Sequence, residues 1–161
     1  MSRKTELEIV TPFLGRDLRL DYTFGGGFFE DADLASATRA GAPVTTRDLS
    51  VASGVEAITQ AIANRLKTRK GELASLGHPN YGSRHHELIG EPNVERTRDL
   101  IKLYVLQALR DEPRIEKVLR AHVEAEHSPP RDSVRITLSV RLVRAATPLN
   151  LVIPFSLEAS L

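Results

Sequence analysis

The chain has 161 residues, of which 41% are hydrophobic and 27% charged, a composition typical of one soluble globular domain with its own core. The formal net charge of +1 gives no reason to expect nucleic acid or an anionic membrane as a partner, and the lack of cysteine excludes disulfides and thiolate chemistry. No apolar run approaches the ~20 residues that cross a bilayer, and the N-terminus lacks a signal core, so we expect a cytoplasmic protein.

The first 47 residues are expected to form an irregular N-terminal arm, with residues 48–161 as the principal domain. Leu18 and Leu20 alternate with charged residues and predict one short strand. The run Gly25–Gly27 then interrupts the pattern, because glycine loses more backbone entropy on ordering than other residues.

Two helices are predicted from apolar residues at helical spacing. The first covers 53–67, where Ser53 and Glu56 have the spacing of a capping box. Its apolar stripe consists of Val55, Ile58, Ile62 and Leu66. The second is predicted to follow Asn93 as N-cap and to end near Glu112, since the next residue is a proline.

After the second helix the apolar period changes from about 3.6 to two, which predicts three strands. They lie at 115–126, 134–142 and 149–157, with connections short enough for an antiparallel meander. We therefore expect an α+β fold in two layers, with a three-stranded C-terminal meander packed against the two main helices. Pro154 places the last strand at an edge, either as a template for another chain or as protection against pairing.

Three local motifs follow in order: Thr68–Glu72, Pro79–Gly82 and Glu112–Arg114. They resemble the T-x-x-G-E turn, the P-x-[YF]-G stretch and the E-P-R motif of the baseplate-wedge family called sheath initiators, the gene-25-product-like family whose relatives include TssE of type VI secretion. The resemblance covers about residues 48–158. The motif residues expected to have a structural role are Thr68, Gly71, Glu72, Pro79, Tyr81 and Gly82.

The resemblance implies a structural baseplate subunit of a phage-tail-like particle that is present in several copies around the tube. Its expected partners are the sheath protein, other wedge subunits, and hub, spike or tube proteins. Glu112, Pro113 and Arg114 would hold the helical core bundle of the wedge, with Arg114 as the leading contact; the alternative is an intramolecular Glu–Arg pair that pins the helix end. The residues expected to share a strand with the sheath are Leu149, Leu151, Ile153, Phe155 and Leu157.

Other functional classes have weaker support. His78, His85, His86 and Glu87 lie in one connector, but their spacing matches no zinc motif, so a solvated polar connector is favoured and no metal or cofactor is expected. A lysozyme-like hydrolase needs two carboxylates across a cleft, and Glu72 has no recognisable second carboxylate. We therefore expect no enzymatic activity, with a tail hydrolase or a generic assembly adaptor as the alternatives.

Overall fold

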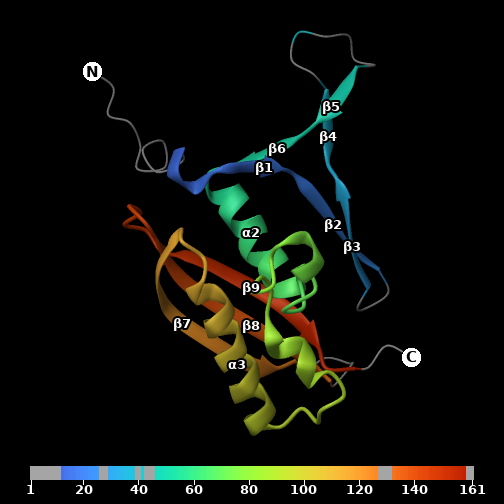
Figure 1. Ribbon diagram of the computed structural model, residues 1–161, viewed down its shortest axis with the longest axis vertical. Helices are drawn as coiled ribbons and strands as arrows, with labels where there is room; N and C mark the ends of the chain where they lie inside the picture. Colours follow the sequence, from blue (N-terminus) through green and yellow to red (C-terminus); the bar gives the residue numbers. More distant parts are fainter. Residues whose placement is uncertain (1–11, 26–28, 39–40, 42–45, 127–131, 159–161) are drawn as a thin grey trace. The chain divides into compact units, whose positions relative to one another are not determined.

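The computed structural model describes residues 12–25, 29–38, 41, 46–126 and 132–158, whose elements are drawn in Figure 1. The chain divides into two compact units, Met1–Gln60 and Ala61–Leu161. The division falls inside helix α2 (Val55–Lys67), whereas the sequence prediction placed the domain boundary between residues 47 and 48.

The C-terminal unit contains the predicted three-stranded meander. Strands β7 (Ile115–Ala125), β8 (Ser133–Leu142) and β9 (Leu149–Ser156) form one antiparallel sheet in the order β7-β8-β9. The strand positions agree with the sequence prediction to within one residue at each end. The α+β fold class is therefore confirmed, and β9 lies at an edge of the sheet.

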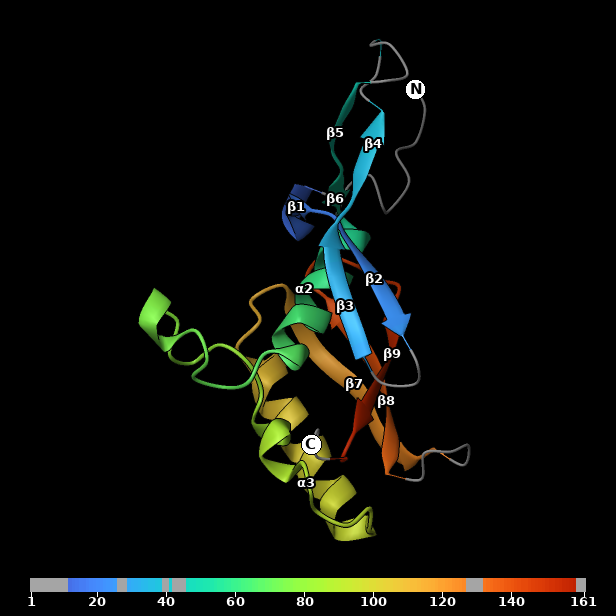
Figure 2. The ribbon, with the colours of Figure 1, turned by 90° about the vertical axis from the view of Figure 1, so that its right-hand side faces the viewer.

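The central strand β8 supplies most of the sheet's buried side chains. Its even-numbered residues are at most 2% exposed: Val134, Ile136, Leu138, Val140 and Leu142. Helix α3 (Glu95–Arg110) packs against β7, as the views in Figures 1 and 2 agree. The helix buries Ile101, Val105, Ala108 and Leu109, so the two-layer arrangement rests on one alternating strand and one helical stripe.

Strand β7 departs from the predicted alternation in its first half. Its pairing with β8 shifts register between Ile115 and Lys117 and again between Val118 and Arg120. Such bulges change which side chains face the core. The regular alternation of this strand would place Leu119 on the inward face, but Leu119 is 40% exposed, while Val118 is partly buried.

The start of helix α3 also differs from the expectation. Its N-cap residue is Val94, which makes no side-chain capping hydrogen bond. The Asn93 side chain instead donates to the carbonyl oxygen of Ser133, and its own oxygen accepts from Arg98. The predicted N-cap was wrong because Asn93 connects the helix start to β8.

The N-terminal unit is more regular than the predicted arm. Its described residues form three two-stranded antiparallel sheets, which pair β1 with β6, β2 with β3, and β4 with β5. The strands are β1 (Arg16–Leu18), β2 (Leu20–Gly25), β3 (Phe29–Leu34), β4 (Ser36–Thr38), β5 (Arg47–Leu49) and β6 (Val51–Ser53). The predicted strand around residues 18–20 is present as parts of β1 and β2, and residues 1–11 and 26–28 lie outside the described residues.

These three small sheets meet at a junction held by main-chain hydrogen bonds. Arg19 donates to Ser50, Ser50 donates to Ala35, and Ala35 donates to Arg19, with N···O distances of 2.8–2.9 Å. The buried side chain of Gln60 accepts from the N–H of Leu20 and donates to the carbonyl of Leu18. Backbone pairing thus organises a segment whose sequence shows little hydrophobic periodicity.

Helix α2 begins at Val55, and Gly54 before it donates its N–H to Gly15. Ser53 is therefore a strand residue of β6, and Glu56 forms an ion pair with Arg19 at 3.3 Å. The predicted capping box was wrong, although the predicted stripe is buried from Ile58 onward. None of the helices in the described parts of the chain has the length and apolar content needed to cross a bilayer.

Candidate functional site

The first two motifs lie side by side and are joined through their backbones. Arg69 and Ser83 form a parallel β-bridge. Ser83 donates its N–H to the carbonyl of Thr68 at 2.9 Å, and Lys70 donates to the carbonyl of Ser83 at 3.1 Å. The T-x-x-G-E turn and the P-x-[YF]-G stretch therefore form one local structure, which their separation in the sequence did not indicate.

Gly82 makes this close approach possible. Its φ is +97°, and a Cβ at this position would lie 2.6 Å from the carbonyl oxygen of Thr68 and 2.7 Å from that of Arg69. Any larger residue would push the two motifs apart and would also strain the backbone. The second motif therefore requires glycine at this position for a steric reason.

Glu72 and Thr68 stabilise the end of α2. The carboxylate of Glu72 accepts the N–H of Arg69 at 3.0 Å, and the hydroxyl of Thr68 donates to the carbonyl of Asn64 at 2.8 Å. Gly71 has a φ of +87° in the turn between them. The sequence interpretation of Glu72 as a brace for the turn after the first helix agrees with this geometry.

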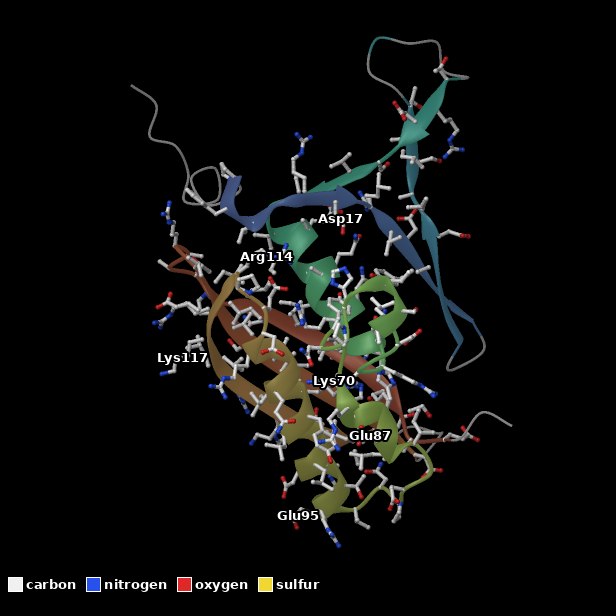
Figure 3. All side chains as sticks on the ribbon, in the orientation of Figure 1. Asp17, Lys70, Glu87, Glu95, Arg114 and Lys117 are labelled. Atoms are coloured by element: carbon white, nitrogen blue, oxygen red, sulfur yellow. The ribbon has the colours of Figure 1, made fainter. Side chains whose placement is uncertain are left out.

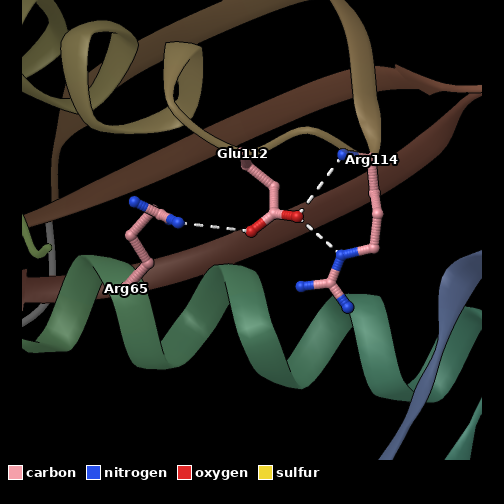
Figure 4. Close-up of polar contacts among 3 residues, drawn as sticks. All are labelled: Arg65, Glu112 and Arg114. Atoms are coloured by element: carbon pink, nitrogen blue, oxygen red, sulfur yellow. Dashed lines mark hydrogen bonds and ion pairs between the residues drawn. The ribbon is translucent and has the colours of Figure 1, made fainter. Parts of the chain in front are cut away.

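The third motif lies at the junction of α3 and β7, where Glu112 is buried with 4% of its side chain exposed. One carboxylate oxygen accepts from Arg114 Nε at 2.6 Å, and the other lies 3.4 Å from Arg65 Nη2 (Figure 4). Burial by itself disfavours the charged form of Glu112. The hydrogen bond and charge of Arg114, with the charge of Arg65, outweigh it and hold the Glu112 pKa below its usual value.

The intramolecular Glu–Arg pair considered from the sequence is therefore present. Glu112 fixes the direction of the Arg114 side chain, 28% of which is exposed, and Pro113 between them is exposed. The pair does not exclude a contact with another protein, since part of the Arg114 side chain remains exposed. Partner binding by this motif stays a prediction.

Arg65 is the residue of this candidate site that sequence reasoning missed. It comes from helix α2 and is only 9% exposed, with its guanidinium 4.6 Å above the ring centre of Tyr81. It thereby connects the second motif to Glu112 of the third. The sequence offered one indication that Arg65 is buried, namely its place beside the apolar stripe, one residue before Leu66.

Two histidines of the connector are withdrawn from solvent, His85 fully and His86 partly, which corrects the prediction of a solvated segment at these two positions. His85 in η2 (Arg84–Leu88) is 2% exposed, its Nδ1 lies 2.7 Å from Ser83 Oγ, and its ring packs edge-on against Phe155. Burial first, and the neighbouring His86 second, lower the pKa of His85 to about 3. His86 donates its Nε2–H to the carbonyl of Leu66, so both rings support the core.

Two other residues of the connector are exposed. Glu87 forms an ion pair with Arg84 at 2.9 Å. His78 lies beyond η1 (Ala74–Leu76), at the start of the second motif. In the described parts of the chain, no three His, Cys, Asp or Glu side chains are grouped as metal ligands would be.

The outer edge of β9 is defined by its register with β8. Leu157 donates its N–H to Asp132 at 2.8 Å, which makes these two residues a hydrogen-bonded pair. Hydrogen-bonded pairs recur at every second residue of an antiparallel ladder, so the main-chain groups of Phe155, Ile153, Leu151 and Leu149 face β8. These four residues and Leu157 are the predicted strand-sharing set.

The main-chain groups that face away from β8 belong to the alternate residues of the strand. They are Asn150, Val152, Pro154 and Ser156. Val152 is 61% exposed, and Pro154 lacks its N–H at an outward position. The odd-numbered side chains thus anchor β9, while the main-chain groups of its even-numbered residues face away from β8.

Comparisons with known proteins agree with this architecture. The family described as Baseplate wedge protein gp25 matches residues 52–148. A solved structure of a candidate tail lysozyme from Geobacter sulfurreducens is similar, with 28% identity and a TM-score of 0.53, over 64% of this chain and 90% of that one. None of the curated proteins matches the chain.

The family match extends over all three motifs and the first two strands of the sheet, and the structure described as a candidate tail lysozyme has a similar fold. This chain belongs to the Baseplate wedge protein gp25 family and is a structural component of a phage-tail-like baseplate.

Proposed function

We propose that this baseplate component joins the wedge and starts the sheath by pairing the outer edge of β9 with a strand of the sheath protein. The observation that carries the proposal is the outward backbone of Asn150, Val152 and Ser156. Among the described residues of the C-terminal unit, these groups have no main-chain partner. Such an edge is a template for an added strand.

Pro154 limits where the added strand pairs. It offers an outward carbonyl but no N–H, so the donors of the edge are separated into Asn150 and Val152 on one side and Ser156 on the other. The continuous pairing frame is therefore 150–153. Pro154 thus allows pairing at residues 150–153 and discourages a longer, uncontrolled association. The two roles considered for this proline, a template edge and protection against pairing, are then combined in one strand.

Electron microscopy of particles from a strain that lacks the gene tests the role. We expect tubes without sheaths, restored by the wild-type gene. Val152→Pro removes one outward N–H and leaves the hydrogen bonds to β8 in place, so sheathed particles should fall at least tenfold. Val152→Ala keeps the N–H and should stay within twofold of wild type.

Circular dichroism and the melting temperature establish that both Val152 variants are folded. Normal sheaths in the deletion strain would overturn the whole proposal and favour a generic adaptor. Normal sheaths with a folded Val152→Pro protein would overturn pairing at β9 alone.

The wedge contact is assigned to the exposed part of Arg114, oriented by Glu112. Arg114→Lys keeps the positive charge near the Glu112 carboxylate but removes the planar fork that suits carboxylates and free carbonyls. We expect the melting temperature to change little while association with the other wedge subunits falls at least tenfold. Loss of folding without selective loss of association would mean that the motif only pins the helix end.

A structural role also fits the carboxylates better than hydrolysis does. A glycosidase acid needs a raised pKa, but the pKa of Glu112 is lowered and Glu72 is bound to the backbone of Arg69. We therefore propose a non-enzymatic subunit that folds in the cytoplasm and is present in several copies around the tube, beside hub, spike or tube proteins. Turnover of peptidoglycan by the wild-type protein, lost in Glu72→Gln, would contradict this.

A further inference from the structure

A cavity of about 440 Å³ lies beside the joined motifs and is separate from the edge of β9. It is lined by Arg65 and Lys70, by the segment Gly77–Tyr81, and by Asp111 at the end of α3. Cavities of this size accept a small ligand or one protruding side chain. Nothing in the proposed strand pairing uses it.

The hydrogen-bond donors and the positive charge of Arg65 are only partly satisfied at this cavity. Its link to Glu112 is long, at 3.4 Å, because the other oxygen of Glu112 is held by Arg114 at 2.6 Å. Its Nε is buried and has no hydrogen-bond acceptor among the described residues. A buried guanidinium with one weak acceptor is costly, so a further acceptor nearby would be stabilising.

The charges around the cavity favour an anion. Among the lining residues, Arg65 and Lys70 supply two positive charges and Asp111 supplies one negative charge, which leaves a net charge of +1 when His78 is neutral. A group with a single negative charge balances this set. The carboxylate of Asp111 at the rim repels a dianion more strongly than a monoanion.

We propose that this cavity receives an aspartate or glutamate side chain from a neighbouring baseplate subunit, an inference that rests on the proposed function. The planar guanidinium of Arg65 suits a carboxylate, and the Tyr81 ring beneath it holds the fork in place. Arginine and tyrosine are also among the residues that dominate binding energy at protein interfaces.

The test uses the full-length protein co-expressed with the other baseplate subunits of its particle, and the readout is the dissociation constant of the wedge complex. Lys70→Glu should weaken association at least tenfold. Lys117→Glu is the matched control, because Lys117 is also an exposed lysine and lies on β7, away from the loop that carries Lys70 (Figure 3). It should change association less than twofold.

Asp111→Asn provides a change of opposite sign. It removes the repelling carboxylate at the rim, so association should tighten twofold or more. General damage to the fold cannot weaken one variant and strengthen the other. Equal effects of Lys70→Glu and Lys117→Glu, or weaker association of Asp111→Asn, would overturn the proposal.

Second-site suppressors of Lys70→Glu identify the partner by its chemistry. We expect an aspartate or glutamate in another baseplate subunit to be replaced by lysine, arginine or a neutral residue. Suppressors found only within this chain would overturn the proposal. If inorganic phosphate at millimolar concentration competes with the wedge subunits while no acidic residue is found, the cavity is an anion site of another kind and the assignment is wrong.

The deletion strain separates the two levels of inference. Normal sheathed particles without the gene would remove the proposed function before the cavity is considered. Sheathless particles in the deletion strain, together with normal particles from Lys70→Glu, would support the proposed function and contradict only the carboxylate site.

Discussion

The two compact units both contain antiparallel strands, but different interactions stabilise them. In the N-terminal unit, paired strands such as β1, β4 and β5 are exposed at every described position, and a ring of main-chain bonds joins the sheets. In the C-terminal unit, β8 buries every second side chain beneath a helix layer. The family match covers 52–148, so it includes most of the unit with a packed core, up to the residue before β9, and leaves out most of the ribbons.

This contrast teaches that strand content alone says little about where stability lies. Two-stranded ribbons exposed on both faces bury little apolar area, and isolated hairpins of this kind are marginally stable in water. A strand with an alternating buried face contributes about 25 cal/mol for each Å² removed from water. Three tests follow, beginning with the largest expected effect; the first compares the two units directly, and the others examine what stabilises the C-terminal unit.

Truncation of matched leucines compares the two units directly. Leu138→Ala in β8 should cost about 3 kcal/mol, because the side chain is fully buried and its loss leaves a cavity. Leu34→Ala in β3 should cost less than about 0.5 kcal/mol, since that side chain is 51% exposed. Urea denaturation measures both, and a similar loss from the two variants would contradict the contrast.

Matched glycines test how tightly the joined motifs pack. Gly82→Ala should destabilise the protein by about 2–3 kcal/mol, because the new methyl group meets the carbonyls of Thr68 and Arg69. Gly77→Ala should cost about 1 kcal/mol, since Gly77 has a positive φ but open space around it. Equal melting temperatures of the two variants would mean that the close approach of the two motifs at Gly82 does not contribute to stability.

The buried histidine predicts a pH dependence of folding. The folded-state pKa of His85 is about 3 against an ordinary value of 6.5, so between these values the unfolded chain binds the extra proton. Stability is full above pH 6.5 and should fall by at most about 1.4 kcal/mol per pH unit as the pH drops through this window. His85→Asn keeps a polar group near Ser83 and should flatten that slope. Denaturation between pH 5 and 7 measures it without interference from carboxylates.

An unchanged slope in folded His85→Asn would mean that the ring is accessible to water and protons in the native protein. His86 contributes in the same direction, because burial lowers its pKa while its bond to the Leu66 carbonyl partly opposes that shift. A double variant at both positions should therefore be flatter than either single one.

The sequence by itself determined the C-terminal unit closely. Helix α2, helix α3 and the three strands were predicted because their apolar residues repeat at 3.6 or two, and a periodic pattern needs no knowledge of distant contacts. The edge position of β9 followed from Pro154 alone, since a proline cannot donate in a central ladder. Glu72 was interpreted from its place after the helix as a brace for that turn, and its carboxylate accepts the N–H of Arg69.

Only the tertiary structure decided the rest of the candidate site. Contacts between residues far apart in the chain bring Arg65 onto Tyr81 and Glu112, bury His85 against Phe155, and join Thr68 to Ser83. The N-terminal ribbons likewise depend on backbone pairing. Where side chains are exposed on both faces of a ribbon, the sequence shows no alternation of apolar and polar residues that would predict the strands. The local sequence pattern specifies helices and strands. The burial of a charge and the close approach of two backbone segments depend instead on which residues the fold places beside them.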